Sequence, residues 1–249
     1  MRKIIDIITV TKDDFEGVLS TIKSTKSLRT SNDVRQIIVD SSLKEIQNKI
    51  KQSVLNEPNI DYTWQAPRGT ATAFNQGLKL SNADWIWFLN GRDEVHHTIE
   101  PDKLIYIIKQ TSADIVIFQM ELMQSGTICG HPPMWAMWPP VNSWVPHPST
   151  IIRYSVFKRY GFFHEKYKTS MDYEIWLRFF SQNITVDTVS IPIALYDETG
   201  ISSTKISHSA IEANEIIKNN FPMLLKKWAG NAKFIYDTIR HYRKTSRQQ

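Results

Sequence analysis

The sequence has almost no cysteine: Cys129 is the single one among 249 residues, so no internal disulfide can form. It also has no long apolar run, because the longest candidate, 85–89, is far shorter than the roughly 20 residues that cross a bilayer. The N-terminus does not combine a basic start with a long apolar stretch, so we expect no signal peptide and take the cytoplasm as the default location. The seven histidines never show the paired spacing of a zinc site, so oxygen ligands are expected for any metal.

Short apolar runs alternate with segments of helical spacing through the first half of the chain. Strands are predicted over 4–10, 34–39, 60–64, 85–89 and 114–120, and helices from Asp13 and over 42–54, 69–80 and 101–110. Helical spacing resumes near Ser155, over 170–181 and in two segments after Ser207. This order predicts an α/β fold with a mostly parallel sheet flanked by helices, of a size that fits one large domain.

The regular pattern stops between residues 122 and 148. Six prolines in this stretch are interleaved with Trp135, Trp138 and Trp144. Loops of this length inside a compact domain are uncommon and are usually functional. The tryptophan rings can stack on a sugar or rest on lipid, and they can equally fill the core beneath a proline-rich lid.

Polar residues follow three of the predicted strands at the point where each strand ends. They are Thr9 and Thr11, then Asp40, and then the segment 90–94, Asn-Gly-Arg-Asp-Glu. Ligands of open parallel sheets bind beyond the carboxyl ends of the strands, so these residues are candidates for a binding site. No GxGxxG or GxxxxGK[ST] loop follows the first strand, which argues against a dinucleotide or P-loop site.

The order and spacing of these segments resemble the GT-A glycosyltransferases of family 2, which include enzymes that build bacterial surface polysaccharides. The matching segments are Ile-Thr-Val-Thr-Lys-Asp at 8–13, Ile-Ile-Val-Asp at 37–40, Gly-Thr-Ala-Thr-Ala-Phe-Asn-Gln-Gly at 69–77, Phe-Leu-Asn-Gly-Arg-Asp at 88–93, His-Pro-Ser-Thr at 147–150 and Asp-Tyr-Glu-Ile-Trp-Leu-Arg at 172–178. The resemblance implies a GT-A (Rossmann-like) domain over 1–205 and a C-terminal helical extension over 206–249. It also implies inverting transfer of a sugar from a nucleoside diphosphate sugar, with uridine diphosphate favoured, to a hydroxyl of a glycan or lipid-linked acceptor.

The resemblance assigns a donor site and a metal site. Asp93 is the expected ligand of Mn²⁺ or Mg²⁺, whose charge would stabilise the departing diphosphate. Asn90 replaces the first acidic residue of the usual D-x-D, and Arg92 is an unusual neighbour that can partly substitute for metal charge. The expected donor-binding residues are Thr9, Thr11, Asp40, Arg68, Asn75, Asn90 and Arg92, with Asp40 accepting a hydrogen bond from the base. Three of these assignments have a purely structural alternative: a polar turn at 90–94, a turn aspartate at position 40 and a solvated arginine at position 68.

Asp172 is the residue that the resemblance implies as the general base for the acceptor hydroxyl. It begins a predicted helix, where the helix dipole favours a carboxylate and where Ser170 can help to cap. A purely structural capping role is the alternative, and the two roles are compatible. The weaker candidates for acceptor contact are Trp138, Trp144 and His147, of which the histidine can also be structural. Glu174 is secondary, because it projects to another face of the helix.

The net charge is +5, and the basic residues concentrate near the C-terminus. A basic amphipathic helix there can lie on an anionic membrane surface, or it can pack on the domain with a solvated face. Nucleic-acid binding lacks a supporting motif. Two other functions stay open: a catalytically silent nucleotide- or carbohydrate-binding protein, favoured by the incomplete D-x-D, and a sugar nucleotidyltransferase, which normally has a glycine-rich basic loop where this chain has Thr11-Lys12-Asp13-Asp14.

Overall fold

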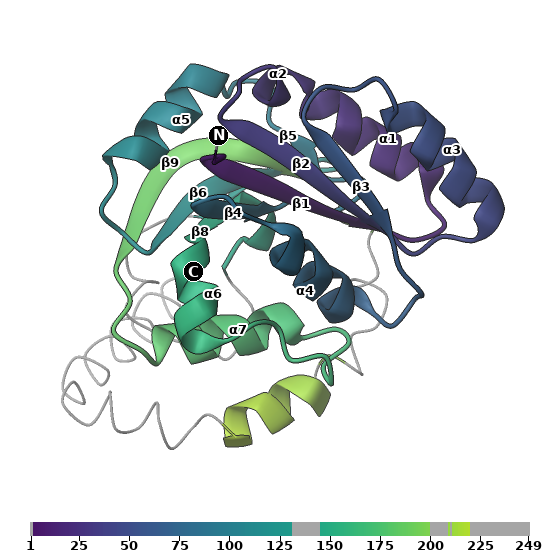
Figure 1. Cartoon of the computed structure of the whole chain (residues 1–249). Helices are drawn as coiled ribbons and strands as arrows, with labels where there is room; N and C mark the ends of the chain where they lie inside the picture. Colours follow the sequence, from purple (N-terminus) through teal and green to yellow (C-terminus); the bar gives the residue numbers. More distant parts are fainter. Residues whose placement is uncertain (1, 131–144, 200–208, 210, 220–249) are drawn as a thin grey trace, which may run out of the picture.

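The computed structural model describes residues 2–130, 145–199, 209 and 211–219, which form one sheet flanked by helices (Figure 1). The strands are β1 (Ile5–Thr11), β2 (Val34–Asp40), β3 (Ile60–Trp64), β4 (Trp85–Phe88), β5 (Glu94–Val95), β6 (Ile115–Leu122), β7 (Ile128–Cys129), β8 (Thr150–Arg153) and β9 (Val186–Tyr196). The helices are α1 (Phe15–Ser24), α2 (Lys26–Arg29), α3 (Lys44–Val54), α4 (Thr70–Leu80), α5 (Pro101–Gln110), α6 (Tyr154–Tyr160) and α7 (Met171–Phe180), with a 3-10 turn at His147–Ser149. All five predicted strands and the predicted helices within the described ranges are present, with ends shifted by no more than a few residues.

The described strands run in the order β3-β2-β1-β4-β8-β6-β9-β5, with β7 paired to β6. The first four strands of this order are parallel, β8 is antiparallel to both of its neighbours, and β6 and β9 are again parallel. The mostly parallel α/β sheet expected from the sequence is therefore confirmed. The sequence pattern did not show β8 and β9. In β9 the register with β6 shifts where Gln119 lies opposite Pro192, which has no N–H for the ladder.

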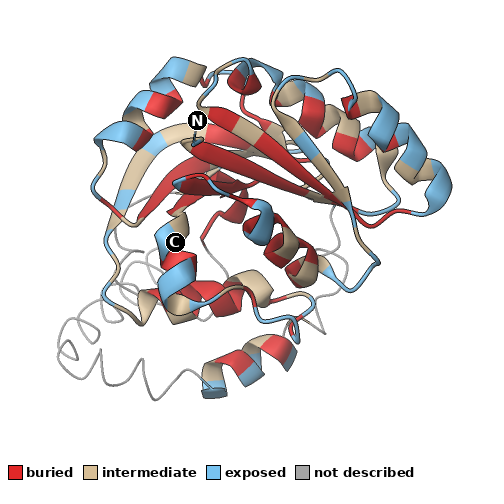
Figure 2. Cartoon of the chain, viewed as in Figure 1, coloured by how far each residue is buried: buried red, intermediate tan, exposed pale blue. Residues whose placement is uncertain are grey.

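The central strands β1, β2 and β4 are largely buried (Figure 2). Their successive core residues pack on opposite faces of the sheet. Ile7 packs in a cluster with residues of α2 and α5, whereas Ile8 packs in a second cluster with residues of α4, α6 and α7. Side chains of a strand alternate between the two faces, so both faces must be covered. Phe88, at the end of β4, shares the second cluster with Trp176 of α7. This packing ties α7 to the strand that carries the 90–93 turn.

Gly77 lets α4 approach β1 closely, and we expect its replacement by alanine to destabilise the fold. A Cβ at this position would lie 2.5 Å from Cγ2 of Ile8, whose side chain is fully buried. Overpacking of this kind costs roughly 1–3 kcal/mol, which exceeds the gain of about 1 kcal/mol in helix propensity at its upper end. Gly77→Ala should lower the unfolding free energy measured in urea. Gly91→Ala is the control, because its Cβ would meet Thr11 Oγ1 at an ordinary 3.4 Å. Equal stability of Gly77→Ala and the native chain would contradict the expectation.

Residues 211–219 form a helix after α7. Its fully buried Ile216 packs against Tyr167, Tyr173 and Leu177, so the helix contributes to the core at the start of α7. The basic segment from residue 220 onward, for which we expected a membrane-facing or solvated helix, lies outside the described residues. In the described ranges no helix is long and apolar enough to cross a membrane.

Candidate functional site

The carboxyl ends of β1, β2 and β3 are aligned, and a pocket of about 650 Å³ opens beyond them. Thr11 pairs with Asp40 across β1 and β2, and Asp40 pairs with Trp64 across β2 and β3. The loops after these strands, the end of β3 and the start of α3 provide the lining, which consists of Lys12, Asp13, Ser41, Ser42, Leu43, Lys44, Gln47, Trp64 and Pro67. The pocket thus lies where ligands of parallel sheets bind.

Hydrogen bonds between the loops hold the pocket wall in place. The indole N–H of Trp64 donates to the Ser42 carbonyl over 3.0 Å, while 46% of the residue stays exposed. The backbone N–H of Asp13 donates to Ser42 Oγ over 2.7 Å, and the Leu43 N–H donates to Asp13 Oδ1 over 2.8 Å. Asp13 has a φ of 53°, a conformation that aspartate adopts more readily than most residues. The pocket therefore has a fixed, exposed aromatic ring on one side, with Lys12 and Lys44 nearby.

Two residues expected to line this pocket lie beneath it instead. Asp40 is fully buried, and its carboxylate accepts from the Ser42 N–H (2.8 Å) and the Tyr62 hydroxyl (2.7 Å). Burial, followed by this hydrogen bond to Asp40, raises the pKa of Tyr62 far above its ordinary value, so the hydroxyl keeps its proton and stays a donor. Thr9 is also fully buried, and its hydroxyl accepts from Gln36 Nε2 over 2.9 Å. The structure corrects both expectations: Asp40 supports the loop after β2, and Thr9 belongs to the sheet interior.

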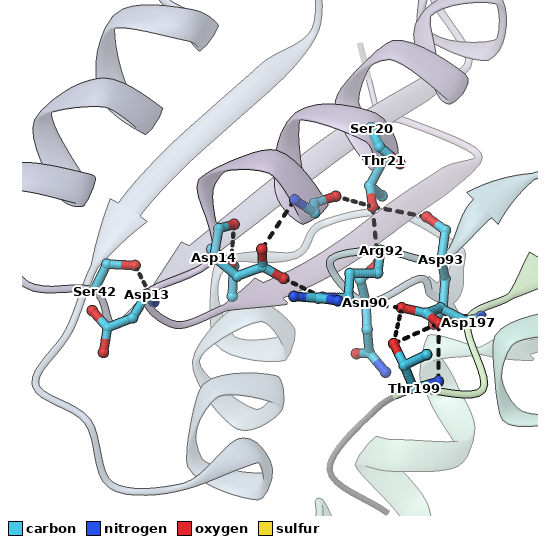
Figure 3. Close-up of polar contacts among 12 residues, drawn as sticks. Asp13, Asp14, Ser20, Thr21, Ser42, Asn90, Arg92, Asp93, Asp197 and Thr199 are labelled. Atoms are coloured by element: carbon cyan, nitrogen blue, oxygen red, sulfur yellow. Dashed lines mark hydrogen bonds and ion pairs between the residues drawn. The ribbon is translucent and has the colours of Figure 1, made fainter. Parts of the chain in front are cut away.

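The turn after β4 docks against the end of β1 and the first turns of α1 (Figure 3). The Gly91 N–H donates to the Val10 carbonyl (3.1 Å), and the Arg92 N–H donates to the Gly17 carbonyl (3.0 Å). The hydroxyl of Thr21 donates to the Asp93 carbonyl over 2.7 Å. Asp13 lines the pocket and its neighbour Asp14 contacts Arg92, so residues 13–14 link the pocket wall to this turn.

Two carboxylates meet at this turn. The backbone N–H of Asp197, one residue after β9, donates to Asp93 Oδ1 over 3.1 Å. Burial raises the pKa of Asp93 to about 7; hydrogen bonds from the Asp197 and Asn90 backbone oppose the rise, and the charge of Asp197 adds to it. Burial also raises the pKa of Asp197, but hydrogen bonds from Thr199 and Gln124 and the charge of Arg92 outweigh it, so this pKa falls below its ordinary value. Asp197 is thus a stable anion beside a carboxyl group that is easily protonated.

Sequence reasoning missed Asp197. It follows a strand that the pattern did not reveal, and the available signal was an acidic residue directly after the run Ile-Ala-Leu-Tyr at 193–196. A strand assigned there would have made Asp197 a candidate by the same rule that selected Asp40 and Asp93.

Arg92 is paired with acidic side chains of two elements. Its Nε lies 2.5 Å from Asp14 Oδ2 and its Nη1 lies 3.7 Å from Asp197 Oδ2, while about half of its side chain is exposed. The hydrogen bond that Arg92 donates to Asp14, and then the charge of Asp14, raise the pKa of the guanidinium. Asp14 also accepts from the Gly17 N–H and so caps α1. Arg92 therefore links α1 to the end of β9, and a donor phosphate would compete with both carboxylates for it.

The oxygen atoms at this turn fit a divalent cation whose remaining ligands come from a substrate. The described part of the chain contains no group of three or more His, Cys, Asp or Glu residues that could hold a metal. Asp93 and Asp197 nevertheless offer carboxylate oxygens, and Asn90 Oδ1 is buried without a hydrogen-bond partner among the described residues. Oxygen donors of this kind suit Mg²⁺ and Mn²⁺, which commonly complete their coordination with phosphate and water.

Asn75 does not face the donor region, which corrects a further expectation. Its Nδ2 donates to the Phe163 carbonyl (2.9 Å) and to Glu165 (3.1 Å), and its Oδ1 accepts from the Phe163 N–H (3.0 Å). It is buried and fastens α4 to the loop before α7. Arg68, just before α4, is exposed, as a residue that contacts a ligand must be.

His147 lies in an aromatic core. Its ring centroid is 5.2 Å from that of Phe88 and 5.8 Å from that of Trp176, and neither ring nitrogen has a hydrogen-bond partner among the described residues. Burial lowers the pKa of His147 to about 4, so the ring is neutral. The structure thus places this residue in the interior and not at an open acceptor entrance. Trp138 and Trp144, the other expected acceptor contacts, lie outside the described residues.

Asp172 is the second residue of α7 and is half-buried. Its Oδ1 accepts from the Tyr173 N–H over 2.8 Å. Ser170 takes the N-cap position, but its hydroxyl donates to the Ser209 carbonyl and makes no side-chain cap, contrary to our expectation. Glu174 is fully buried in a two-pronged ion pair with Arg178 (2.9 and 3.0 Å), so its role is structural.

The open, mostly parallel sheet, with a pocket at the ends of β1–β3 and carboxylates after β4, defines a protein of the GT-A class. The model of the family described as glycosyl transferase family 2 matches residues 6–173, and the chain belongs to this family. Uncharacterized glycosyltransferase Rv1514c of Mycobacterium tuberculosis (strain H37Rv) is 28% identical over 91 residues, which are 36% of this chain and 34% of that protein. The match thus spans about a third of that relative.

Solved structures share the fold at low sequence identity. The structure of S. aureus TarS 1-349 in complex with UDP-GlcNAc has a TM-score of 0.68 at 14% identity, covering 90% of this chain and 67% of that one. The mannosyltransferase PcManGT from Pyrobaculum calidifontis, in complex with GDP-Man and Mn²⁺, has a TM-score of 0.59 at 12% identity, covering 79% of this chain and 57% of that one. Both likenesses are to the GT-A fold.

Proposed function

We propose that this chain transfers a sugar from a nucleoside diphosphate sugar to a hydroxyl group of a glycan or lipid-linked acceptor, with inversion at the anomeric carbon. The observation that carries the proposal is the link from the pocket at the ends of β1–β3, through Asp13, Asp14 and Arg92, to the Asp93–Asp197 pair. A pocket of about 650 Å³ with an exposed aromatic wall suits a nucleoside, and the adjoining carboxylates suit a cation that binds a diphosphate.

In this proposal the pocket and the 90–93 turn bind different parts of the donor. Trp64 offers a ring for stacking on the base, and Thr11 lies at the junction between the pocket and the 90–93 turn. A divalent cation held by Asp93, with Asp197 beside it, would supply positive charge to the diphosphate as it leaves. Arg68 is exposed at the start of α4 and can contact the same phosphates.

Asp172 is the proposed base that takes the proton from the acceptor hydroxyl as it attacks the anomeric carbon. The N-terminus of α7 favours the ionised form of this carboxylate, which a base requires. Direct displacement with a single base inverts the anomeric configuration. Uridine diphosphate is the favoured leaving group, in keeping with the structural similarity to TarS in complex with UDP-GlcNAc; the similarity to PcManGT in complex with GDP-Man and Mn²⁺ supports a divalent metal and keeps guanosine diphosphate as a competitor.

Calorimetric titration of uridine, thymidine and guanosine diphosphates, each with and without Mn²⁺, tests the donor site. We expect one nucleotide to bind, more weakly without the metal, and Trp64→Ala to weaken that binding by about 10-fold, since base stacking contributes roughly 1–3 kcal/mol. Tyr106→Ala is the matched control, because Tyr106 is an exposed aromatic on α5.

One feature of the sequence supports the alternative of a catalytically silent binding protein: Asn90 occupies the first position of the usual acidic pair. Nucleotide binding without sugar transfer or donor hydrolysis across a panel of acceptors would favour it. Failure of all three nucleotides to bind with or without Mn²⁺ would count against sugar transfer and would favour a silent carbohydrate-binding protein.

A further inference from the structure

The helix at 211–219 reaches back to the loop that leads into α7 (Figure 1). Glu212, on this helix, is only 6% exposed. Its Oε1 accepts from the backbone N–H of Lys168 over 2.8 Å. Its Oε2 accepts from the Thr169 N–H (2.9 Å), the Thr169 hydroxyl (2.9 Å) and the Ser170 N–H (2.8 Å). One carboxylate thus gathers donors from three consecutive residues that directly precede α7.

This arrangement keeps Glu212 ionised and holds the loop in one conformation. Burial raises the pKa of Glu212, but the hydrogen bonds from Lys168, Thr169 and Ser170 outweigh it, so the pKa falls below its ordinary value. Hydrogen bonds to an ionised acceptor are stronger than those between neutral groups. Four bonds on one side chain fix the backbone of 168–170 far better than separate contacts with solvent would.

Neighbouring contacts anchor the helix to the same place. Ser170 donates its hydroxyl to the Ser209 carbonyl, and Ile216 packs against Tyr173 on the first turn of α7. The loop also contacts the donor side of the protein, because Lys168 Nζ donates to the Glu165 carbonyl (2.7 Å) and the Arg68 carbonyl (3.4 Å). The 165–170 loop therefore connects the residue before α4 with the start of α7.

We propose that Glu212 is a positioning residue for Asp172, acting from the helix at 211–219 through the backbone of 168–170. This inference rests on the proposed function, in which Asp172 is the base. Asp172 stands two residues beyond Ser170, so the direction of its carboxylate depends on how the chain enters α7. A displacement of about 1 Å in a reacting group can cost a factor of about 100 in rate. The helix at 211–219 then supports the active site and is not an appendage to the domain.

The test compares Glu212→Ala and Glu212→Gln with Glu215→Gln in the full chain. Glu215 lies one turn further on the same helix and pairs with Lys166 at the surface, so it is the matched control. For Glu212→Ala we expect kcat for sugar transfer to fall by at least about 10-fold, with the affinity for the nucleoside diphosphate within about 2-fold of the native chain. The kcat of Glu212→Gln should lie between those of Glu212→Ala and the native chain, because its amide oxygen can accept the Oε2 bonds but its NH₂ group cannot accept from Lys168. Glu215→Gln should keep the native kcat.

Hydrogen exchange and a double-variant comparison make the result specific. The amides of 168–170 should exchange faster in Glu212→Gln than in Glu215→Gln, and this readout does not depend on activity. In an Asp172→Glu background, where the carboxylate is already displaced, Glu212→Ala should cost less in kcat than in the native chain. The inference would be overturned if the fold-losses in kcat of Asp172→Glu and Glu212→Ala multiplied fully in the double variant. Native kcat in Glu212→Ala would overturn it as well. Native transfer by Asp172→Asn would instead overturn the proposed function, and the two failures are therefore distinguishable.

Discussion

Asp172→Asn is expected to lower kcat for sugar transfer by about 100- to 10,000-fold while the affinity for the nucleoside diphosphate stays unchanged. General base catalysis typically contributes a factor of this size, and an amide cannot take the proton of the acceptor hydroxyl. The asparagine oxygen can still accept from the Tyr173 N–H, so the start of α7 should survive the change. The measurement pairs the rate of nucleotide release in the presence of acceptor with a calorimetric titration of the nucleotide.

Asp102→Asn provides the control for this variant. Asp102 is the second residue of α5, as Asp172 is the second residue of α7, so both substitutions remove one negative charge from the first turn of a helix. We expect native kcat for Asp102→Asn. A loss of nucleotide affinity in Asp172→Asn as large as the loss of rate would show that Asp172 serves donor binding and not proton transfer.

Asp93→Asn is expected to make the ligand-free protein more stable at pH 8 and, at the same time, to abolish the effect of Mn²⁺ on nucleotide binding. The pKa of Asp93 in the folded protein is raised from 3.8 to about 7, so the folded state holds this proton more tightly than the unfolded state does. The stabilisation is fully present below about pH 4 and is lost as the pH rises through 7. At about 1.4 kcal/mol for each unit of pKa, ionised Asp93 lowers the unfolding free energy of the native chain by up to about 4 kcal/mol at pH 8. The neutral asparagine avoids this loss.

Urea unfolding at pH 5 and pH 8, without metal, measures this difference. The gap in unfolding free energy between Asp93→Asn and the native chain should be about 2–3 kcal/mol larger at pH 8 than at pH 5, because part of the loss is already present at pH 5. Asp84→Asn is the control, because Asp84 is half-exposed in a surface ion pair with Arg2, so this substitution removes a surface charge and leaves the buried carboxyl group in place. An equal gap at both pH values would mean that Asp93 is ionised in the ligand-free protein throughout this range.

The expected pH dependence also bears on donor binding. A cation held at this turn would require the ionised form of Asp93, and Asp197 is already an anion beside it. Ionisation of the buried Asp93 above pH 7 lowers the stability of the native chain. A cation bound at Asp93 would restore that stability, because its positive charge offsets the cost of the buried carboxylate. Native proteins commonly hold such unfavourable groups at the sites where they bind ligands.

Local pattern was enough to predict the elements of the parallel half of the sheet. The runs at 34–39 and 60–64 are short, apolar or β-branched and bounded by turn residues, so their neighbours in sequence already determine that they are strands. The rule that ligands bind beyond strand ends then selected Thr11 and Asp93, both of which lie at the edge where the structure has its pocket and carboxylate pair.

The same rule selected Thr9 and Asp40, and there it was wrong about what the side chains face. Thr9 is buried in the sheet with its hydroxyl on Gln36, and Asp40 is occupied by Tyr62 and the backbone of Ser42. Position in a strand gives the face of the sheet, but it does not reveal which polar partner from another strand takes the hydrogen bond. Asn75 failed for the same reason, because its partners at Phe163 and Glu165 lie about 90 residues away in sequence.

The sequence by itself determined the α/β class, the family and the loops that hold the candidate site, because these follow from periodicity and from the order of short motifs. Only the tertiary structure decided that Asp197 joins Asp93 and that Glu212 holds the entry to α7. Both contacts join residues more than 40 positions apart, one across the end of β9 and one across the C-terminal helix. Such pairs form only when the sheet order and helix packing bring the two segments together, and local spacing carries no information about that distance.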